Sequence, residues 1–347
     1  MRSSVTIAVL LMAIAAAPAS AQTAVDRPVT FSVINKNDSL MRCATDGRAY
    51  TLRGSLVAPA SAMERSPRSI TLLVHGAMLP GDELWRFRPG GDESYDFTLA
   101  MARLGHAVAT VSLVGYGDTV GADFPDGNLV CQGGNADAIS QVVAQLKNGS
   151  YGGPAFDRVA IFGSSFGGQY VQVAAYSFPN IDALISLGWA DPILPAPVGV
   201  QFTSATGLTC FLGGEAKYDD GSGPGGYVLR PGDIAVGVQW TDAEPKAEDF
   251  WIRSMERDPC GNQTSIPARF VADTIGLPRI KIPTLVVDGT GDELVGWIAP
   301  HILYSRLTGT DDKTLMLFPG AGHSFFLERR RAEWTRRISG WLEERGY

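Results

Sequence analysis

Short stretches of consecutive apolar residues recur along this chain and alternate with longer amphipathic stretches. Four of the apolar stretches are Ser69–Ala77, His106–Gly117, Arg158–Ser165 and Ala183–Gly188. Their apolar residues follow one another directly instead of occupying every second position. This pattern predicts strands that are covered on both faces, as in a parallel sheet.

Helical patterns separate these predicted strands. Residues 92–105 precede the second strand and residues 134–149 precede the third. The alternation of strand and helix predicts an α/β protein with a doubly wound, mostly parallel sheet. Two earlier segments, 29–35 and 48–59, are predicted to form an antiparallel hairpin at the edge of that sheet.

The alternation stops after Trp189 and resumes near Ile280. Glycine and proline are frequent between them, as in residues 211–226, and aromatic residues are scattered. Such a segment is too long for a loop. We therefore predict that residues 189–280 form a cap between sheet strands six and seven.

Two more strands and a helix complete the predicted core. The strands lie within residues 282–295 and 313–326, and an amphipathic helix covers residues 330–345. Residues 22–188 and 281–347 would then form one α/β core on either side of the cap.

The first residues have the pattern of an export signal. Arg2 precedes an apolar run, Val5–Ala17, and small residues at 19–21 precede Gln22. The run is shorter than the roughly 20 residues that a membrane span needs. We therefore predict a cleavable signal peptide at residues 1–21, no stable membrane anchor, and an exported protein that is periplasmic or secreted.

Export changes the interpretation of the four cysteines, because an oxidising compartment favours disulfides over thiols. We favour Cys43 with Cys131 and Cys210 with Cys260, since the second pair lies within the predicted cap. Buried free thiols are the alternative. The spacing of the cysteines does not indicate a zinc site.

Composition and charge narrow the classes of partner. The chain is 45% hydrophobic and 19% charged, as is typical of a folded globular protein. A net charge of −7 without any basic run disfavours nucleic acid and anionic membranes as partners. A small or extended organic substrate fits better. No H-E-x-x-H motif or phosphate-binding loop indicates a metal or cofactor.

The chemistry is indicated first by the residues Gly163-Ser164-Ser165-Phe166-Gly167. They match G-x-S-x-G directly after a predicted strand and before a predicted helix, which is the setting of a nucleophile on a sharp turn. Side chains at the two glycine positions would collide with the strand or the helix. The middle serine, Ser165, is therefore the predicted nucleophile.

A serine hydroxyl needs a base to remove its proton. His323 follows the last predicted strand in a loop containing glycine, so its imidazole can reach the sheet edge. The other three histidines have mainly structural interpretations: His75, His106 and His301. His323 is the predicted base.

The base needs a carboxylate to orient it. Asp292 follows the seventh strand and precedes His323, which gives the chain order Ser, Asp, His. The alternatives are Asp191 after the sixth strand, Asp288 and Glu293.

The developing oxyanion needs donors placed in advance. The backbone N–H of Phe166 follows the nucleophile and is the first candidate. The second is the N–H of Ala77 after the third strand, with Met78 as a neighbour that could replace it. His75 is assigned to holding this loop.

Four motifs in order, "VHGA", "GSSFG", "GTGDE" and "GAGH", resemble the α/β-hydrolase fold superfamily. The resemblance covers nearly the whole chain after the signal peptide apart from the cap. The "HGA…W" opening and "LVGYGDT" resemble its secreted esterase and lipase-like members. Ser164 departs from the pattern of many relatives, which have histidine at this position. A serine nucleophile disfavours the dehalogenases and epoxide hydrolases of the superfamily, which use aspartate.

This resemblance and the predicted triad imply a serine hydrolase that cleaves carboxylic esters through an acyl-enzyme without a cofactor. An amide or peptide hydrolase or a lyase on the same triad is the alternative. A binding protein without activity is a third, less favoured because every position of the triad is filled.

Overall fold

The computed structural model describes residues 24–117, 124–190, 197–229 and 239–347. Within these residues, one eight-stranded sheet has the order β1-β2-β4-β3-β5-β6-β9-β10. Its strands are β1 (Ala24–Ile34), β2 (Ala49–Pro59), β3 (Ser69–Val74), β4 (Val108–Val111), β5 (Arg158–Ser164), β6 (Ala183–Leu187), β9 (Thr284–Gly289) and β10 (Lys313–Phe318). The signal-peptide prediction lies outside the described residues.

The sheet is parallel from β4 to β10, and β1 and β2 are antiparallel at one edge. Buried side chains alternate between its faces. Leu72 and Val74 of β3 belong to one hydrophobic cluster, whereas Leu73 belongs to the other. Both faces are covered, which explains why the strands are continuously apolar and confirms the predicted doubly wound α/β class.

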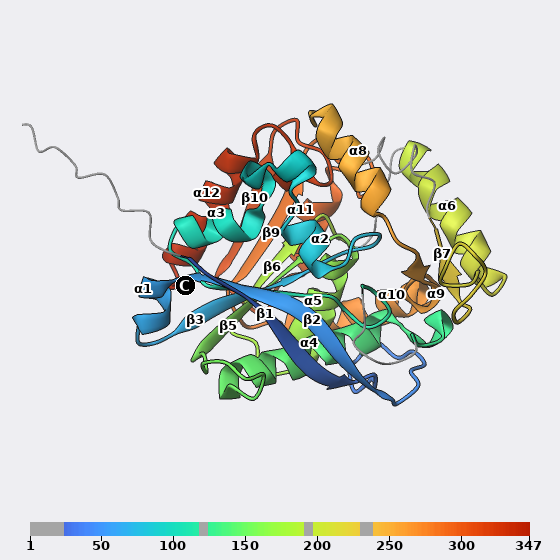
Figure 1. Ribbon diagram of the computed structural model, residues 1–347, viewed down its shortest axis with the longest axis horizontal. Coiled ribbons are helices and arrows are strands. Elements are labelled where there is room, and N and C mark those ends of the chain that lie inside the picture. The colour runs from blue at the N-terminus through green and yellow to red at the C-terminus, as the bar shows by residue number, and fades with distance from the viewer. Residues whose placement is uncertain (1–23, 118–123, 191–196, 230–238) are drawn as a thin grey trace, which may run out of the picture.

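Helices cover both faces of the sheet (Figure 1). The helices α4 and α5 pack on the first cluster, and α3 and α12 pack on the second. The helices outside the segment between β6 and β9 are α1 (Ala60–Glu64), α2 (Gly81–Trp85), α3 (Phe97–Arg103), α4 (Gln132–Asn148), α5 (Phe166–Ser177), α11 (Ala299–Arg306) and α12 (Arg331–Glu343).

One helix is shorter than predicted. Residues 92–105 contain a 3-10 turn at Glu93–Tyr95, and α3 begins only at Phe97. The cause is Asp96, which has extended backbone and accepts a hydrogen bond from the N–H of Leu99 at 2.9 Å. Because an N-cap residue is not itself helical, Asp96 separates the 3-10 turn from α3.

The segment between β6 and β9 contains the whole of the predicted cap, residues 189–280 (Figure 1). Its described elements are α6 (Pro197–Phe211), β7 (Tyr227–Val228), α8 (Pro245–Ser254), β8 (Asp258–Pro259), α9 (Cys260–Thr264) and α10 (Ile266–Gly276). The strands β7 and β8 pair with each other and are separate from the large sheet. We keep the cap boundaries as a proposal and call residues 189–280 the proposed cap.

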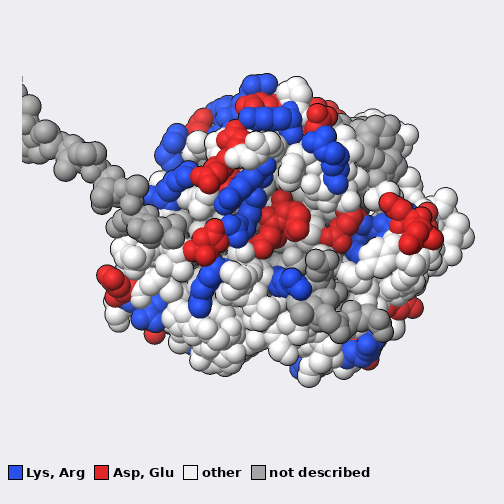
Figure 2. Space-filling model, viewed as in Figure 1, with Lys and Arg blue, Asp and Glu red and all other residues white. Residues whose placement is uncertain are grey.

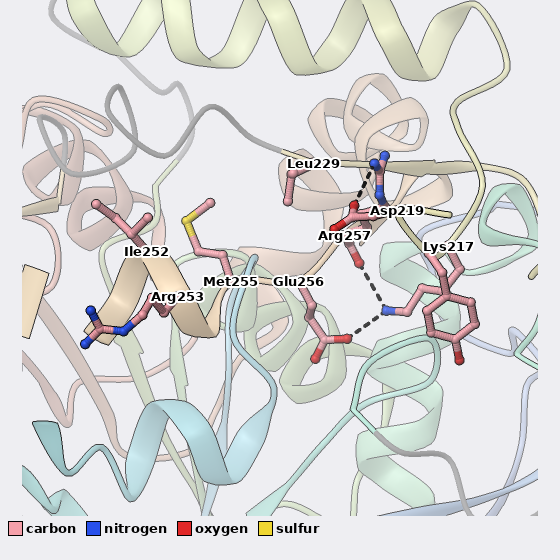
Figure 3. A pocket seen from close by; sticks show the side chains of 9 residues that line it. Lys217, Asp219, Leu229, Ile252, Arg253, Met255, Glu256 and Arg257 are labelled. Atoms are coloured by element: carbon pink, nitrogen blue, oxygen red, sulfur yellow. Dashed lines mark hydrogen bonds and ion pairs between the residues drawn. The ribbon is translucent and has the colours of Figure 1, made fainter. Parts of the chain in front are cut away.

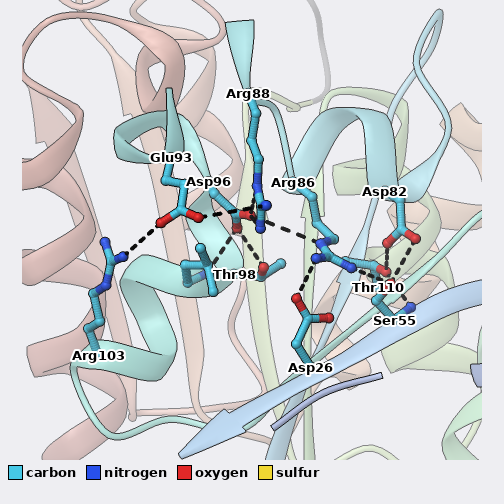
Figure 4. A network of polar contacts seen from close by, with 11 residues as sticks. Asp26, Ser55, Asp82, Arg86, Arg88, Glu93, Asp96, Thr98, Arg103 and Thr110 are labelled. Carbon is cyan, nitrogen blue, oxygen red and sulfur yellow. Dashed lines mark hydrogen bonds and ion pairs between the residues drawn. The ribbon is translucent and has the colours of Figure 1, made fainter. Parts of the chain in front are cut away.

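A polar network holds α2, the helix that follows the loop after β3 (Figure 4). Asp82 of α2 accepts hydrogen bonds from Thr110 of β4 and, at 2.8 Å, from Ser55 of β2. Arg86 donates to the Ser55 hydroxyl and pairs with Asp26 at 2.6 Å. The network fixes the downstream end of the loop that carries Ala77.

Figure 2 shows acidic and basic side chains interspersed over much of one face of the molecule.

The structure joins the cysteines in the favoured pairing. Cys43, in the connection between β1 and β2, is bonded to Cys131 at the start of α4. Cys210 near the end of α6 is bonded to Cys260 at the start of α9. No described helix has both the length and the apolarity needed to cross a bilayer.

Removing the disulfide between Cys43 and Cys131 is expected to lower stability. The bond closes a loop over a sequence separation of 88 residues. Cross-links of this kind restrict the unfolded chain and stabilise by about 2–5 kcal/mol. The double variant Cys43→Ala/Cys131→Ala should lower the free energy of unfolding, measured by denaturant titration, by that amount. An unchanged denaturation midpoint would contradict the prediction.

Candidate active site

Ser165 lies at the turn between β5 and α5. Its backbone has φ 57° and ψ −125°, a conformation that is strained for any residue except glycine. Its N–H donates a hydrogen bond of 2.9 Å to the carbonyl of Leu187, the last residue of β6. The surrounding structure therefore holds the serine in a costly conformation, as is typical of functional sites.

Glycines make this turn possible. A Cβ atom on Gly163 would lie 2.0 Å from the carbonyl oxygen of Gly167, and one on Gly167 would lie 2.5 Å from that of His75. Gly76, in the loop after β3, has the same constraint, since its Cβ would lie 2.7 Å from that of Ser165. The loop of Gly76 can approach the serine closely only because it has no side chain there.

His323 and Asp292 form a buried pair. Asp292 Oδ2 and His323 Nδ1 are 2.6 Å apart, and the two residues are 4% and 1% exposed. His323 Nε2 is buried and has no hydrogen-bond partner among the described residues. The imidazole ring lies beside Gly188, directly after the Leu187 carbonyl that binds Ser165. Nε2 is thus not engaged by another described residue.

The protein stabilises the charged form of Asp292. Its Oδ1 accepts hydrogen bonds from the N–H groups of Leu294 and Val295, at 2.7 and 2.9 Å. Burial alone would raise the pKa of this carboxyl, but the charge and hydrogen bond of His323 outweigh it and lower the pKa below its ordinary value. Asp292 is therefore ready to orient and stabilise a protonated imidazole.

Asp288 has the opposite environment. It is 1% exposed near the end of β9, and its Oδ1 accepts a hydrogen bond from the N–H of Gly289. Burial, followed by the negative charge of Asp292 and a hydrogen bond to it, raises the pKa of Asp288 well above its ordinary value. Two neighbouring buried carboxyls with pKa values shifted apart have different tasks, and only Asp292 contacts the imidazole.

The other acids and histidines take no part in this pair. Glu293 is exposed, and Asp191 lies outside the described residues. His106 Nε2 lies 2.8 Å from the hydroxyl of Ser339, and His301 is exposed on α11.

His75 holds the loop after β3. Its Nε2 accepts a hydrogen bond of 3.0 Å from the N–H of Leu113, so the proton is on Nδ1, which donates to the carbonyl of Gly76 at 2.7 Å. Burial lowers the pKa of His75 to about 4, so it stays neutral at pH 7. Its bonds connect this loop to the end of β4.

The two oxyanion candidates belong to two segments that meet at Ser165, the start of α5 and the loop after β3. Phe166 is the first residue of α5, where N–H groups point out of the helix N-terminus. The N–H of Ala77 has no acceptor among the described residues. The N–H of Met78 instead donates to Asp258 Oδ1 at 2.7 Å, so it is not available to an oxyanion.

A small cavity with a free volume of about 10 Å³ lies beside Ser165. The loop after β3, the nucleophile turn, the proposed cap and the residue after His323 contribute its lining: Gly76, Ala77, Met78, Leu84, Ser164, Ser165, Gln239, Trp251 and Ser324. Trp251 is one of the scattered aromatic residues of the predicted cap, whereas nothing in the sequence marks Gln239, because only the fold brings it to the sheet edge. Within the described residues, no cluster of three or more His, Cys, Asp or Glu has the arrangement of a metal site.

Comparison with known proteins gives the family. A family model described as "Alpha/beta hydrolase family" matches residues 71–336. The chain belongs to this family. The matched range of this α/β hydrolase contains Ser165, Asp292 and His323. No curated protein sequence matches the chain.

Solved structures of other α/β hydrolases resemble this one in fold. An esterase from Exiguobacterium antarcticum is 18% identical, with a TM-score of 0.59 over 86% of this chain and 97% of that one. A monoacylglycerol lipase from Paleococcus ferrophilus is 19% identical, with a TM-score of 0.58 over 80% and 94%. A meta-cleavage product hydrolase from Pseudomonas fluorescens is 15% identical, with a TM-score of 0.53 over 90% and 99%. At these identities the likeness concerns the fold alone.

Proposed function

We propose that this α/β hydrolase is an exported serine esterase that cleaves carboxylic esters with Ser165, His323 and Asp292. The observation that carries the proposal is the buried contact of 2.6 Å between His323 Nδ1 and Asp292, which leaves Nε2 for the serine on the strained turn. A nucleophile, a base and an orienting carboxylate in these roles make up a hydrolytic triad.

The steps follow from the roles of these groups. Ser165 Oγ attacks the ester carbonyl carbon while His323 Nε2 takes its proton, and Asp292 stabilises the imidazolium. The carbonyl oxygen becomes an oxyanion and accepts hydrogen bonds from the N–H groups of Ala77 and Phe166. Proton return to the alcohol releases it and leaves an acyl-enzyme. Water, activated by the same histidine, then attacks the acyl-enzyme and frees the acid.

The cavity supports a short acyl group as the preferred substrate. Its free volume of about 10 Å³ is far below the usual range of ligand pockets, which favours a small acyl group over a long one, and Met78, Leu84 and Trp251 make part of its lining apolar. Esterases and lipases occur among the structural neighbours, which agrees with ester cleavage. We keep amide cleavage as the alternative, since the same triad serves both bonds.

Export is supported by the two disulfides, which persist in oxidising compartments, together with the signal-like residues 1–21. A periplasmic or secreted esterase with a net charge of −7 would take a small or extended ester, with neither a cofactor nor nucleic acid as a partner.

The test is hydrolysis by residues 22–347, produced in an oxidising compartment. We expect turnover of p-nitrophenyl acetate and butyrate, with kcat/KM falling for octanoate and laurate and lower still for a p-nitroanilide of the same short acyl group. A preference for the anilide would favour the amide hydrolase. Folded, disulfide-bonded protein without ester turnover would refute the proposal.

A further inference from the structure

Met78 lies in the loop that carries Ala77, and its backbone is strained. Its φ is 77°, and it and Ser165 are the non-glycine residues with positive φ in the described chain. The Met78 side chain is buried, with the residue 3% exposed. Such a conformation persists only where surrounding contacts impose it.

The proposed cap supplies those contacts. The N–H of Met78 donates to Asp258 Oδ1 at 2.7 Å, and the carbonyl of Met78 accepts from the N–H of Glu256 at 2.8 Å. Both backbone groups of one strained residue are therefore bound by residues 256–258, which we call the cap strap. Asp258 is fully buried.

The cap strap is itself anchored at both ends. The Glu256 carboxylate accepts hydrogen bonds from the N–H of Gly117, after β4, and at 2.7 Å from the ammonium of Lys217, which is 5% exposed. Figure 3 shows Lys217 reaching Glu256 beside a pocket of the proposed cap. Just after the other end, the N–H of Cys260 donates a hydrogen bond to the carbonyl of Gly226, and the sulfur of Cys260 is bonded to that of Cys210. These contacts prevent the strap from moving independently of the loops beside the active site.

We infer that Asp258 is a positioning residue for the oxyanion hole: its carboxylate fixes Met78 and so orients the N–H of Ala77 toward Ser165. Binding the Met78 N–H also removes the neighbouring donor, which leaves that of Ala77 to the oxyanion. This inference rests on the proposed function, because it names what completes the same site. A donor displaced by about 1 Å can lower the rate of such a reaction by roughly 10²-fold.

The effect of Asp258 is geometric. A negative charge near a developing oxyanion opposes that charge, so the carboxylate does not help through its field. What it provides is a fixed hydrogen-bond acceptor. An asparagine at this position keeps an acceptor oxygen and lacks the charge, which makes it the variant that separates the two effects.

The first test compares Asp258→Ala with Asp258→Asn on p-nitrophenyl butyrate. For the alanine variant we expect kcat to fall by about 10²-fold, within the range for loss of an oxyanion donor, while KM changes by only a few-fold. The kcat of the asparagine variant should be at least about tenfold higher than that of the alanine variant. Asp220→Ala, which removes an exposed carboxylate from the same segment, is the matched control and should behave as wild type.

A second readout reports on the oxyanion directly. A trifluoromethyl ketone binds the serine as a hemiketal whose oxygen occupies the oxyanion hole, so its affinity should fall in parallel with kcat for Asp258→Ala. A merely destabilised protein would lose active fraction, and its remaining molecules would bind the ketone as wild type. Far-UV circular dichroism and the thermal midpoint verify that each variant is folded.

The outcomes separate this inference from the proposed function. Folded Asp258→Ala with wild-type kcat and ketone affinity would overturn the inference while leaving the esterase in place. If the wild-type protein hydrolyses no ester, the proposed function fails. The inference is then tested by the rate at which a fluorophosphonate labels Ser165, because the phosphoryl oxygen of this reagent would accept hydrogen bonds from the same two N–H groups. Equal labelling of wild type and Asp258→Ala, or no labelling of either, would then overturn the inference.

Discussion

Replacing Ser165 by alanine is expected to lower kcat for ester hydrolysis by at least about 10⁴-fold. Without the hydroxyl no acyl-enzyme forms, and only the oxyanion donors and substrate binding continue to act. Stopped-flow and steady-state assays on p-nitrophenyl butyrate measure the loss. The same variant should not be labelled by a fluorophosphonate, whereas wild type is modified at Ser165.

Ser164→Ala is the matched control for this variant. Ser164 is the last residue of β5 and is 3% exposed, so both serines lie at one turn and differ in backbone conformation. We expect Ser164→Ala to be labelled at Ser165 and to keep ester turnover. Labelling of Ser164 in wild type, or activity that survives in Ser165→Ala, would refute the assignment of the nucleophile.

Replacing Asp292 by asparagine is expected to lower kcat by roughly 10⁴-fold, because an amide cannot stabilise the imidazolium and favours the wrong tautomer of His323. Asp288→Asn is the control at the same end of β9. Because burial and Asp292 raise the pKa of Asp288, its neutral form predominates over a wider range of pH, and an amide resembles that form. The Asp288 variant should therefore keep most of its activity at neutral pH.

The two carboxyls also make opposite contributions to stability across pH. The pKa of Asp292 is lowered on folding, so its contribution is present above the ordinary aspartate pKa and is lost as pH falls through the lowered value. The pKa of Asp288 is raised, so its contribution is present at low pH and is lost as pH rises through the raised value. As pH rises from acid to alkaline, the free energy of unfolding of Asp288→Asn should accordingly fall less than that of wild type. Identical stability profiles for the two proteins would contradict this assignment.

Much of the site can be predicted from sequence because its groups follow strand ends. Ser165 is marked by glycines at positions where a side chain would collide, and the structure explains each collision. Asp292 and His323 come directly after β9 and β10, and parallel strands bring such loops to one edge of the sheet. Local chemistry and topology were sufficient to predict the contact between Asp292 and His323, and the catalytic roles of the three residues stay a prediction.

The rest depends on side-chain hydrogen bonds that the pattern of apolar residues does not encode. Asp258 binds Met78 across a sequence separation of 180 residues, from a two-residue strand in an irregular segment. The helix predicted at 92–105 begins late, at Phe97, because the side chain of Asp96 caps it there. In both cases a buried carboxylate binds a backbone N–H, but the partner of Asp96 is three residues away, whereas that of Asp258 becomes apparent only in three dimensions.

The pairing of the cysteines has a consequence for how the protein is made. Each cysteine is bonded to the next one along the chain, so the loops closed by Cys43–Cys131 and Cys210–Cys260 occupy separate stretches and neither encloses the other. If the chain is exported, as we propose, an oxidant that joins cysteines in the order in which they emerge during translocation would produce these pairs directly. Biosynthesis would therefore require a thiol oxidase but no enzyme that reshuffles mispaired bonds.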